Sequence, residues 1–264
     1  MEIFHYAFMQ KALIAGIFLA LSTGFISFFV VNKDLSFIGT GIAHILFGGL
    51  ALGVLAGLPP FLCGALFALL SAFGIATFSW NKRISANIFI GIFLSLSMAL
   101  GIIFIKLQSS NIDVFSYLFG SILGISSTEL LIFGSLSLFL SAFFLFNLKN
   151  LLLSIFDPMY GKAIKAPVLF FHYALLFCVA LAVILMVRII GVIMVEGLLI
   201  FPGISAYYIA KNYRQQIVFS LLFAFISIFG GIFLSASGLK LPTGPAIILV
   251  AFAIFAVCYG FKKR

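Results

Sequence analysis

The chain has 264 residues, of which 64% are hydrophobic and only 8% charged, and its formal net charge is +9. Soluble domains carry about a quarter charged residues, so this composition excludes an ordinary water-soluble protein. A membrane-spanning bundle fits instead, because each helix that crosses a hydrocarbon core about 30 Å thick needs about 20 apolar residues.

Nine apolar runs of about span length follow one another, and their continuity favours helices over the alternating strands of a barrel. They cover residues 12–31, 38–58, 60–80, 86–105, 130–148, 168–187, 191–209, 216–236 and 244–261. The second run lies close to the third and the sixth close to the seventh, so either pair can include a run that crosses incompletely. We therefore expect an all-α polytopic transmembrane bundle of eight to nine helices, in one domain over 1–264.

Ionisable side chains inside these runs are the candidate functional residues, because one near the centre of a span costs about 2.5–3.5 kcal/mol. His44 lies in the second run, where it is either a structural histidine or, because an imidazole suits a transition metal, a metal ligand. Thr40 lies one helical turn earlier and offers a weak neutral oxygen. Glu196, in the seventh run, is interpreted either as a carboxylate on an ion path or as a partner of Arg188 near the outer interface.

Residues near the ends of the runs are assigned structural roles. Trp80 is expected to be an interface anchor, and His172 an interfacial residue rather than a ligand. Pro202 and Gly203 are expected to kink the seventh helix, as kinks often mark moving or pore-lining segments.

The outer connection, residues 107–129, is longer than a turn. Its residues 117–124 are too short to span and too apolar for a free loop, so we expect them to be partly inserted at the outer face. Ser126 and Glu129 have the spacing of a capping box, which predicts the start of the next helix.

The inner connection, residues 149–167, contains a helix-start signal. Asp157 is a good N-cap, and Pro158 suits the first helical position. We expect a short cytoplasmic helix near 157–165. It is either a plain connector or a docking element for a cytoplasmic partner.

The distribution of lysine and arginine predicts the orientation. With the C-terminus inside, eleven of the 15 basic residues lie on the inner side, and the outer side holds Lys11, Lys106, Arg188 and Lys240. The positive-inside rule then makes the C-terminus cytoplasmic, and an odd number of spans would leave the N-terminus outside. No base-stacking or groove-reading motif is visible, so no nucleic-acid partner is expected.

Four stretches, in this order, are similar to one known family. They are residues 8–31, residues 36–53 with SFIGTGIAH, residues 156–167 with FDPMYGKAIKAP, and residues 191–206 with GVIMVEGLLIFPGISA. The chain resembles the membrane permease subunit of ATP-binding-cassette (ABC) importers for zinc, manganese and related metal ions. The third stretch is similar to the family's cytoplasmic coupling element.

The resemblance implies a transport subunit rather than an enzyme, placed in the bacterial cytoplasmic (inner) membrane. It implies no tightly bound cofactor and a divalent metal ion as cargo, with zinc first and manganese or iron as alternatives. The implied partners are a second copy of the chain, cytoplasmic ATP-binding subunits and an extracytoplasmic metal-binding receptor protein. An ion-coupled secondary transporter is the alternative from another class.

The resemblance also assigns roles to residues. It places His44 on the metal path, where the family commonly has an aspartate at the position of Thr40, and Glu196 is a candidate for the missing negative charge. Coupling to the ATPase is assigned to Asp157, Pro158, Tyr160 and Lys162. ATP hydrolysis is expected on a partner chain, because Ala163 follows Gly161 and Lys162 where a P-loop needs Ser or Thr.

Overall fold

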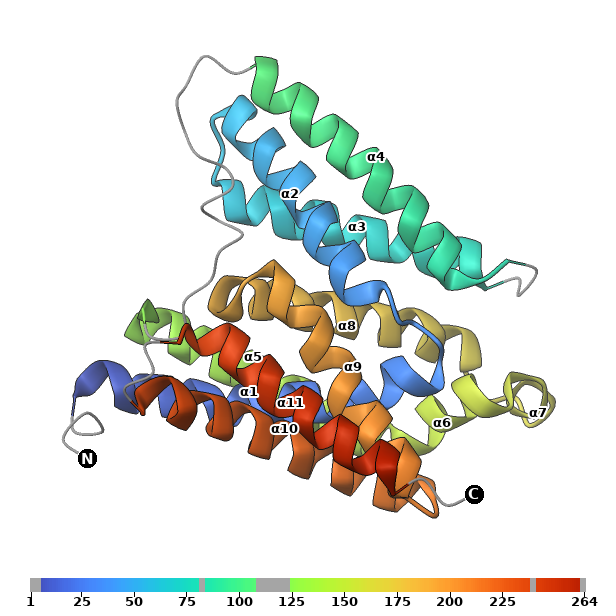
Figure 1. Ribbon diagram of the computed structural model, residues 1–264. Helices are drawn as coiled ribbons and strands as arrows, with labels where there is room; N and C mark the ends of the chain where they lie inside the picture. The colour runs from blue at the N-terminus through green and yellow to red at the C-terminus, as the bar shows by residue number, and fades with distance from the viewer. Residues whose placement is uncertain (1–5, 81–83, 108–123, 238–240, 262–264) are drawn as a thin grey trace. The chain divides into compact units, whose positions relative to one another are not determined.

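The computed structural model describes residues 6–80, 84–107, 124–237 and 241–261, and within those ranges it has helices but no strand (Figure 1). The helices are α1 (Ala7–Asn32), α2 (Ile38–Ala56), α3 (Pro60–Ser79), α4 (Ala86–Leu107), α5 (Ser127–Phe146), α6 (Leu148–Phe156), α7 (Pro158–Ala163), α8 (Val168–Ile190), α9 (Val192–Ile209), α10 (Tyr213–Ala236) and α11 (Thr243–Gly260). Eight of them are long and apolar enough to cross a membrane, and α9 contributes a shorter apolar helix. The predicted all-α bundle of eight to nine spans is confirmed.

Each of the nine apolar runs corresponds to one helix, because a segment in lipid must satisfy its backbone hydrogen bonds internally. The nine-residue helix α6 was not predicted, since it directly follows the apolar run that forms α5. Residues 117–124, for which an insertion at the outer face was predicted, lie outside the described residues except for Gly124.

The chain divides into two compact units. The first contains α1, α9, α10, α11 and most of α5, and the second contains α2, α3, α4, α6, α7 and most of α8. A single functional domain over 1–264 stays a prediction.

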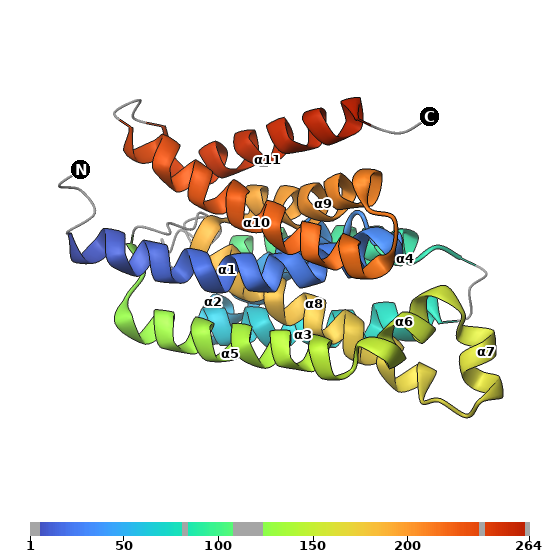
Figure 2. The same ribbon diagram turned by 90° about the horizontal axis from the view of Figure 1, so that it is seen from below.

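In the first unit, α1 packs closely against α10 (Figure 2). A side chain at Gly24 would lie 2.7 Å from the Cα atom of Leu221, so the absence of a Cβ allows the two backbones to approach. The Ser220 hydroxyl uses this proximity and donates a hydrogen bond of 2.8 Å to the Gly24 carbonyl. Small residues therefore determine this contact, as is usual between helices in lipid.

Helix α9 runs alongside α11 in the same direction. Near its start, Gly197 lies against Ile248, and near its end the Tyr208 and Tyr259 rings meet edge-on with centroids 5.3 Å apart. Because α11 is itself long and apolar enough to cross a membrane, α9 traverses a comparable depth despite its shorter apolar segment. This arrangement favours nine crossings over eight.

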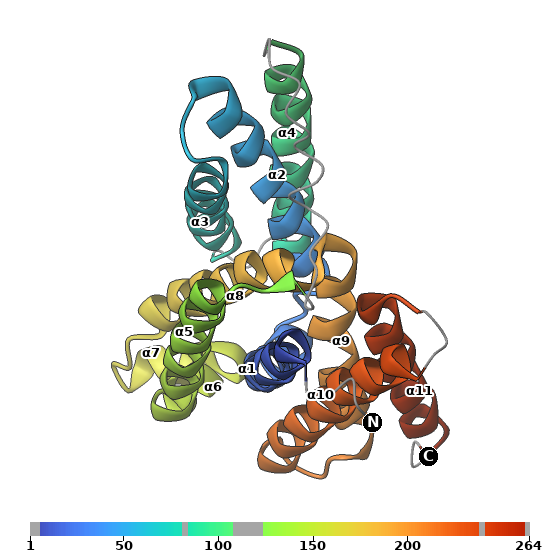
Figure 3. The same ribbon diagram turned by 90° about the vertical axis from the view of Figure 1, so that its left-hand side faces the viewer.

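In the second unit, α2 lies between α3 and α4 (Figure 3). Its glycines lie on two faces: Gly41 and Gly48 contact α4, while Gly49 and Gly53 contact α3. Helix α2 ends at Gly57, whose φ of 66° is the left-handed conformation that favours glycine. Close backbone approach is therefore present on both sides of the helix that carries His44.

The predicted capping box at the start of α5 is confirmed. The Glu129 carboxylate accepts a hydrogen bond of 3.0 Å from the Ser126 amide, and the Ser126 hydroxyl accepts one of 3.2 Å from the Glu129 amide. Two amides that lack a helical partner are thereby satisfied.

Candidate functional site

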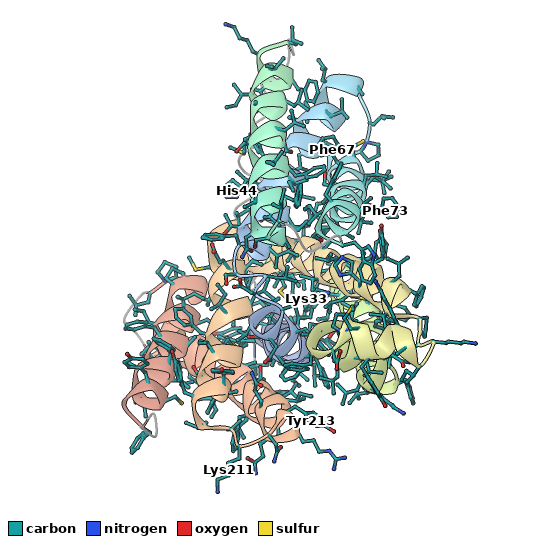
Figure 4. The ribbon with its side chains drawn as sticks, turned by 90° about the vertical axis from the view of Figure 1, so that its right-hand side faces the viewer. Lys33, His44, Phe67, Phe73, Lys211 and Tyr213 are labelled. Carbon is teal, nitrogen blue, oxygen red and sulfur yellow. The ribbon has the colours of Figure 1, made fainter. Side chains whose placement is uncertain are left out.

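The His44 side chain is half-buried on α2, in the second unit (Figure 4). Its Nδ1 atom lies 2.9 Å from the Thr40 carbonyl oxygen, one helical turn earlier. A carbonyl oxygen can only accept, so Nδ1 carries the proton and donates. The neutral imidazole then has its lone pair on Nε2, the atom left to act as a ligand.

This is the arrangement that orients histidines in metal sites, where one ring nitrogen binds the ion and the other donates to a carbonyl or carboxylate. The structure therefore brings Thr40 and His44 together, but through the backbone carbonyl of Thr40. Sequence reasoning considered only the Thr40 hydroxyl. The four-residue spacing is the signal that could have identified the carbonyl contact.

His44 lies on the face of α2 that packs against α4. Gly41 and Gly48 flank it at helical spacing, and their missing side chains would meet Ile90 and Ser97 of α4. The Ser97 hydroxyl also donates a hydrogen bond of 3.0 Å to the Ile45 carbonyl. Close backbone packing thus holds α4 beside the imidazole.

Glu196 is half-buried on α9, in the first unit, whereas Thr40 and His44 belong to the second. Among the described acidic residues it is the one placed beyond the first turn of a helix. Across the described ranges, no three His, Cys, Asp or Glu side chains cluster in a way that could hold a metal ion. Arg188, the alternative partner of Glu196, places its guanidinium 5.2 Å from the centre of the Phe61 ring.

Pro202, which is expected to kink this helix together with Gly203, lies inside α9, and the kink itself stays a prediction. The amide of the next residue, Gly203, donates a hydrogen bond of 2.7 Å to the Ser27 hydroxyl of α1. A Cβ atom at Gly203 would clash with the Ser27 backbone. A serine and a glycine distant in sequence therefore join α1 to the proline-containing part of α9, a contact for which the sequence offers no local signal.

The helix expected after Asp157 is α7. The Asp157 carboxylate accepts a hydrogen bond of 2.8 Å from the Tyr160 amide, and Pro158 occupies the first turn. Pro158 and Gly161 are buried, while Met159 and Tyr160 are 76% and 56% exposed. A six-residue helix thus turns one face into the protein and presents an apolar and aromatic face outward.

Lys162, for which a role in coupling to the ATPase is predicted, contacts a neighbouring helix of the same unit. Its Nζ atom lies 4.6 Å from the centre of the Trp80 ring, at the end of α3. His172, predicted to be interfacial, is buried, and its Nε2 atom donates a hydrogen bond of 3.0 Å to the Ala76 carbonyl. A structural role for His172 is thereby supported over a ligand role.

Length, composition and helix packing define a polytopic α-helical membrane protein, in which the His44 imidazole lies on an apolar helix and contacts the Thr40 carbonyl through Nδ1. Residues 5–262 match the ABC 3 transport family, and the chain belongs to this family. It is a membrane permease subunit of the metal-ion ABC importers.

Two relatives and one solved structure illustrate the similarity. The manganese transport system membrane protein MntC of Halalkalibacterium halodurans is 28% identical over 100% of this chain and 90% of its own length. A protein of Haemophilus influenzae described as an iron transport system membrane protein is 30% identical over 100% of this chain and 97% of its own. The structure described as PsaBC from Streptococcus pneumoniae in complex with Fab has a TM-score of 0.82 at 30% identity, covering 98% of this chain and 93% of that one.

Proposed function

We propose that this chain imports a divalent first-row transition metal across the bacterial cytoplasmic membrane, and that His44 is a ligand on the path. The observation that carries the proposal is the hydrogen bond from His44 Nδ1 to the Thr40 carbonyl, which directs the Nε2 lone pair to a ligand. An ion-coupled secondary transporter, the alternative from another class, has no support from the family match.

Manganese is the proposed cargo and iron the next candidate, since relatives across the full chain are named for these metals. Zinc, placed first by the sequence interpretation, has no such support among these relatives. Thr40 supplies no carboxylate, and manganese favours oxygen ligands. We therefore propose Glu196 as a second binding position on the path, where its carboxylate would attract the cation.

Helix α7 is the proposed docking element for cytoplasmic ATP-binding subunits. Its exposed Met159 and Tyr160 side chains offer an apolar and aromatic surface to a groove in the ATPase. The Asp157 cap and Pro158 hold this short helix in one conformation. A displacement of its exposed face by the ATPase would therefore move α7 as a whole.

The remaining parts of the proposal follow from the resemblance and from charge. A second copy of the chain and an extracytoplasmic metal-binding receptor complete the importer. Within the first unit, Lys211 and Arg214 lie at the end of the bundle opposite to Lys11, which supports a cytoplasmic C-terminus.

The metal path is tested by uptake of radioactive manganese into vesicles that contain the full complex. His44→Ala removes the ligand, whereas His44→Gln retains an N–H donor for the Thr40 carbonyl but lacks the imidazole lone pair. Both variants are expected to assemble normally and to lose most uptake. Wild-type uptake by His44→Gln would refute the ligand role, and competition with iron and zinc ranks the cargo.

Docking is tested by copurification with the ATP-binding subunits. Asp157→Ala and Tyr160→Ala are expected to weaken it, because the first removes the cap and the second an exposed contact. Ser126→Ala is the matched control, since it removes a cap of the same kind from α5. Unchanged copurification by both α7 variants would refute the docking role.

A further inference from the structure

Three side chains from three helices of the second unit form a stack, which we call the Trp80 stack: Lys162 of α7, Trp80 at the end of α3 and His172 of α8. The Lys162 ammonium lies 4.6 Å from the centre of the Trp80 ring. The His172 ring meets the same indole edge-on, with centroids 5.2 Å apart and planes at 61°. The indole thus contacts both α7 and α8.

The His172 side of the stack is rigidly held. The imidazole is only 5% exposed, and its Nε2 atom lies 3.0 Å from the Ala76 carbonyl and 3.3 Å from the Ser79 hydroxyl, both on α3. The neighbouring residue repeats the connection, since the Tyr173 hydroxyl donates a hydrogen bond of 3.1 Å to Thr77. The start of α8 and the end of α3 are therefore joined by several polar contacts.

The α7 side depends on close packing. A Cβ atom at Gly161 would lie 2.5 Å from a Val168 methyl group, so α7 lies directly on the first residue of α8. The next residue, Lys162, is exposed and places its ammonium over the indole. A cation over an indole is attracted by the ring quadrupole, most strongly for tryptophan among the aromatic residues.

We propose that Trp80 is a positioning residue for transport: by linking Lys162 to His172, it makes α3 and α8 follow α7 when the ATP-binding subunit moves that helix. The inference rests on the proposed docking role of α7. Under this inference, Lys162 acts within the permease. Its side chain transmits the movement of α7 to the membrane helices instead of contacting the ATPase.

The chain offers a matched control for this link. Arg188 lies over the Phe61 ring at 5.2 Å and joins the same two helices, α8 and α3, by the same kind of contact. Phe61 lies in the first turn of α3 and Arg188 in the last turn of α8, so this pair lies at the end of the helices remote from α7. Removing this pair weakens the contact between α3 and α8 and leaves the contacts of Trp80 with Lys162 and His172 intact.

The experiment measures ATP hydrolysis and manganese uptake in the same vesicles, with the permease, its ATP-binding subunits and its receptor present. Trp80→Leu is expected to keep the hydrolysis rate but to lower the uptake per ATP several-fold. Lys162→Met is expected to lower this ratio by about two- to fivefold, the factor of a single cation–π contact. Phe61→Leu is expected to leave it unchanged.

Combining Lys162→Met with Trp80→Leu is expected to add nothing beyond Trp80→Leu alone, because both remove one link. A wild-type ratio for Trp80→Leu, an equal loss for Phe61→Leu, or additive losses in the double variant would overturn the proposal. If Trp80→Leu does not fold, Lys162→Met decides alone, since Lys162 is exposed and a wild-type ratio would overturn the proposal.

The docking role of α7 and the role of Trp80 can be refuted separately. Unchanged copurification of the Asp157→Ala and Tyr160→Ala variants would refute the docking role of α7, and the link would fall with it. Weakened copurification of those variants together with a wild-type uptake per ATP for Trp80→Leu would refute the link alone.

Discussion

Replacing Gly48 with alanine tests whether close packing of α4 on α2 is required at the candidate metal path. The new Cβ atom would lie 2.6 Å from the Ser97 carbonyl oxygen and closer still to its hydroxyl. Ordinary van der Waals contact begins at 3.4 Å, so the helices must separate locally by roughly 0.8 Å. The displacement falls one helical turn after His44.

The magnitude follows from three contributions. Overpacking a well-packed contact costs about 1–3 kcal/mol. The bond from the Ser97 hydroxyl to the Ile45 carbonyl, 3.0 Å long, is lost at about 1 kcal/mol. The higher helix propensity of alanine offsets about 1 kcal/mol of this destabilisation. The net loss in the free energy of unfolding is therefore about 1–3 kcal/mol.

The assay is thermal unfolding of the purified complex in one fixed detergent, with manganese uptake measured in parallel. Gly91→Ala is the control on α4, because nothing lies within 4 Å of its Cβ position. Gly48→Ala is expected to lower the Tm by several degrees and to reduce uptake, while Gly91→Ala keeps or raises the Tm. Equal Tm values for the two variants would refute the packing argument.

Three further predictions concern Thr40, Ser27 and Glu129. Thr40→Asp places a carboxylate one turn before His44, at an insertion cost of about 2.5–3.5 kcal/mol. The Tm of this variant is expected to fall without metal and to recover with excess manganese. A Tm that does not recover would contradict the His44 site. Ser27→Ala leaves the Gly203 amide without its 2.7 Å acceptor and is expected to cost about 1–3 kcal/mol in thermal unfolding. Glu129→Gln weakens the capping box and is expected to cost no more than about 1 kcal/mol with uptake unchanged, so a transport defect would contradict its structural role.

Most of the fold could be predicted from local signals. The apolar runs predict the long helices because lipid leaves the backbone no other partner than its own helix. Ser126 with Glu129, and Asp157 with Pro158, indicate helix starts because caps depend on residues close in sequence. Helix α6 was missed, because its few apolar residues continue the preceding run.

The candidate site was less accessible to sequence reasoning. The spacing of Thr40 and His44 suggested a pair, but the structure joins them through a carbonyl that every residue possesses. The contact between Trp80 and Lys162 joins residues on separate helices, and only tertiary packing brings them together. The contact between Trp80 and Lys162 therefore leaves no local pattern in the amino-acid sequence, whereas the Thr40–His44 contact leaves its four-residue spacing.

The central claim is that this permease moves metal with energy from ATP hydrolysed by a partner. The most direct measurement is manganese accumulation in vesicles that contain either the purified chain alone or the chain with its ATP-binding subunits, receptor and ATP. We expect accumulation against the gradient only with the partners and ATP present. Uphill accumulation by the chain alone would contradict the account.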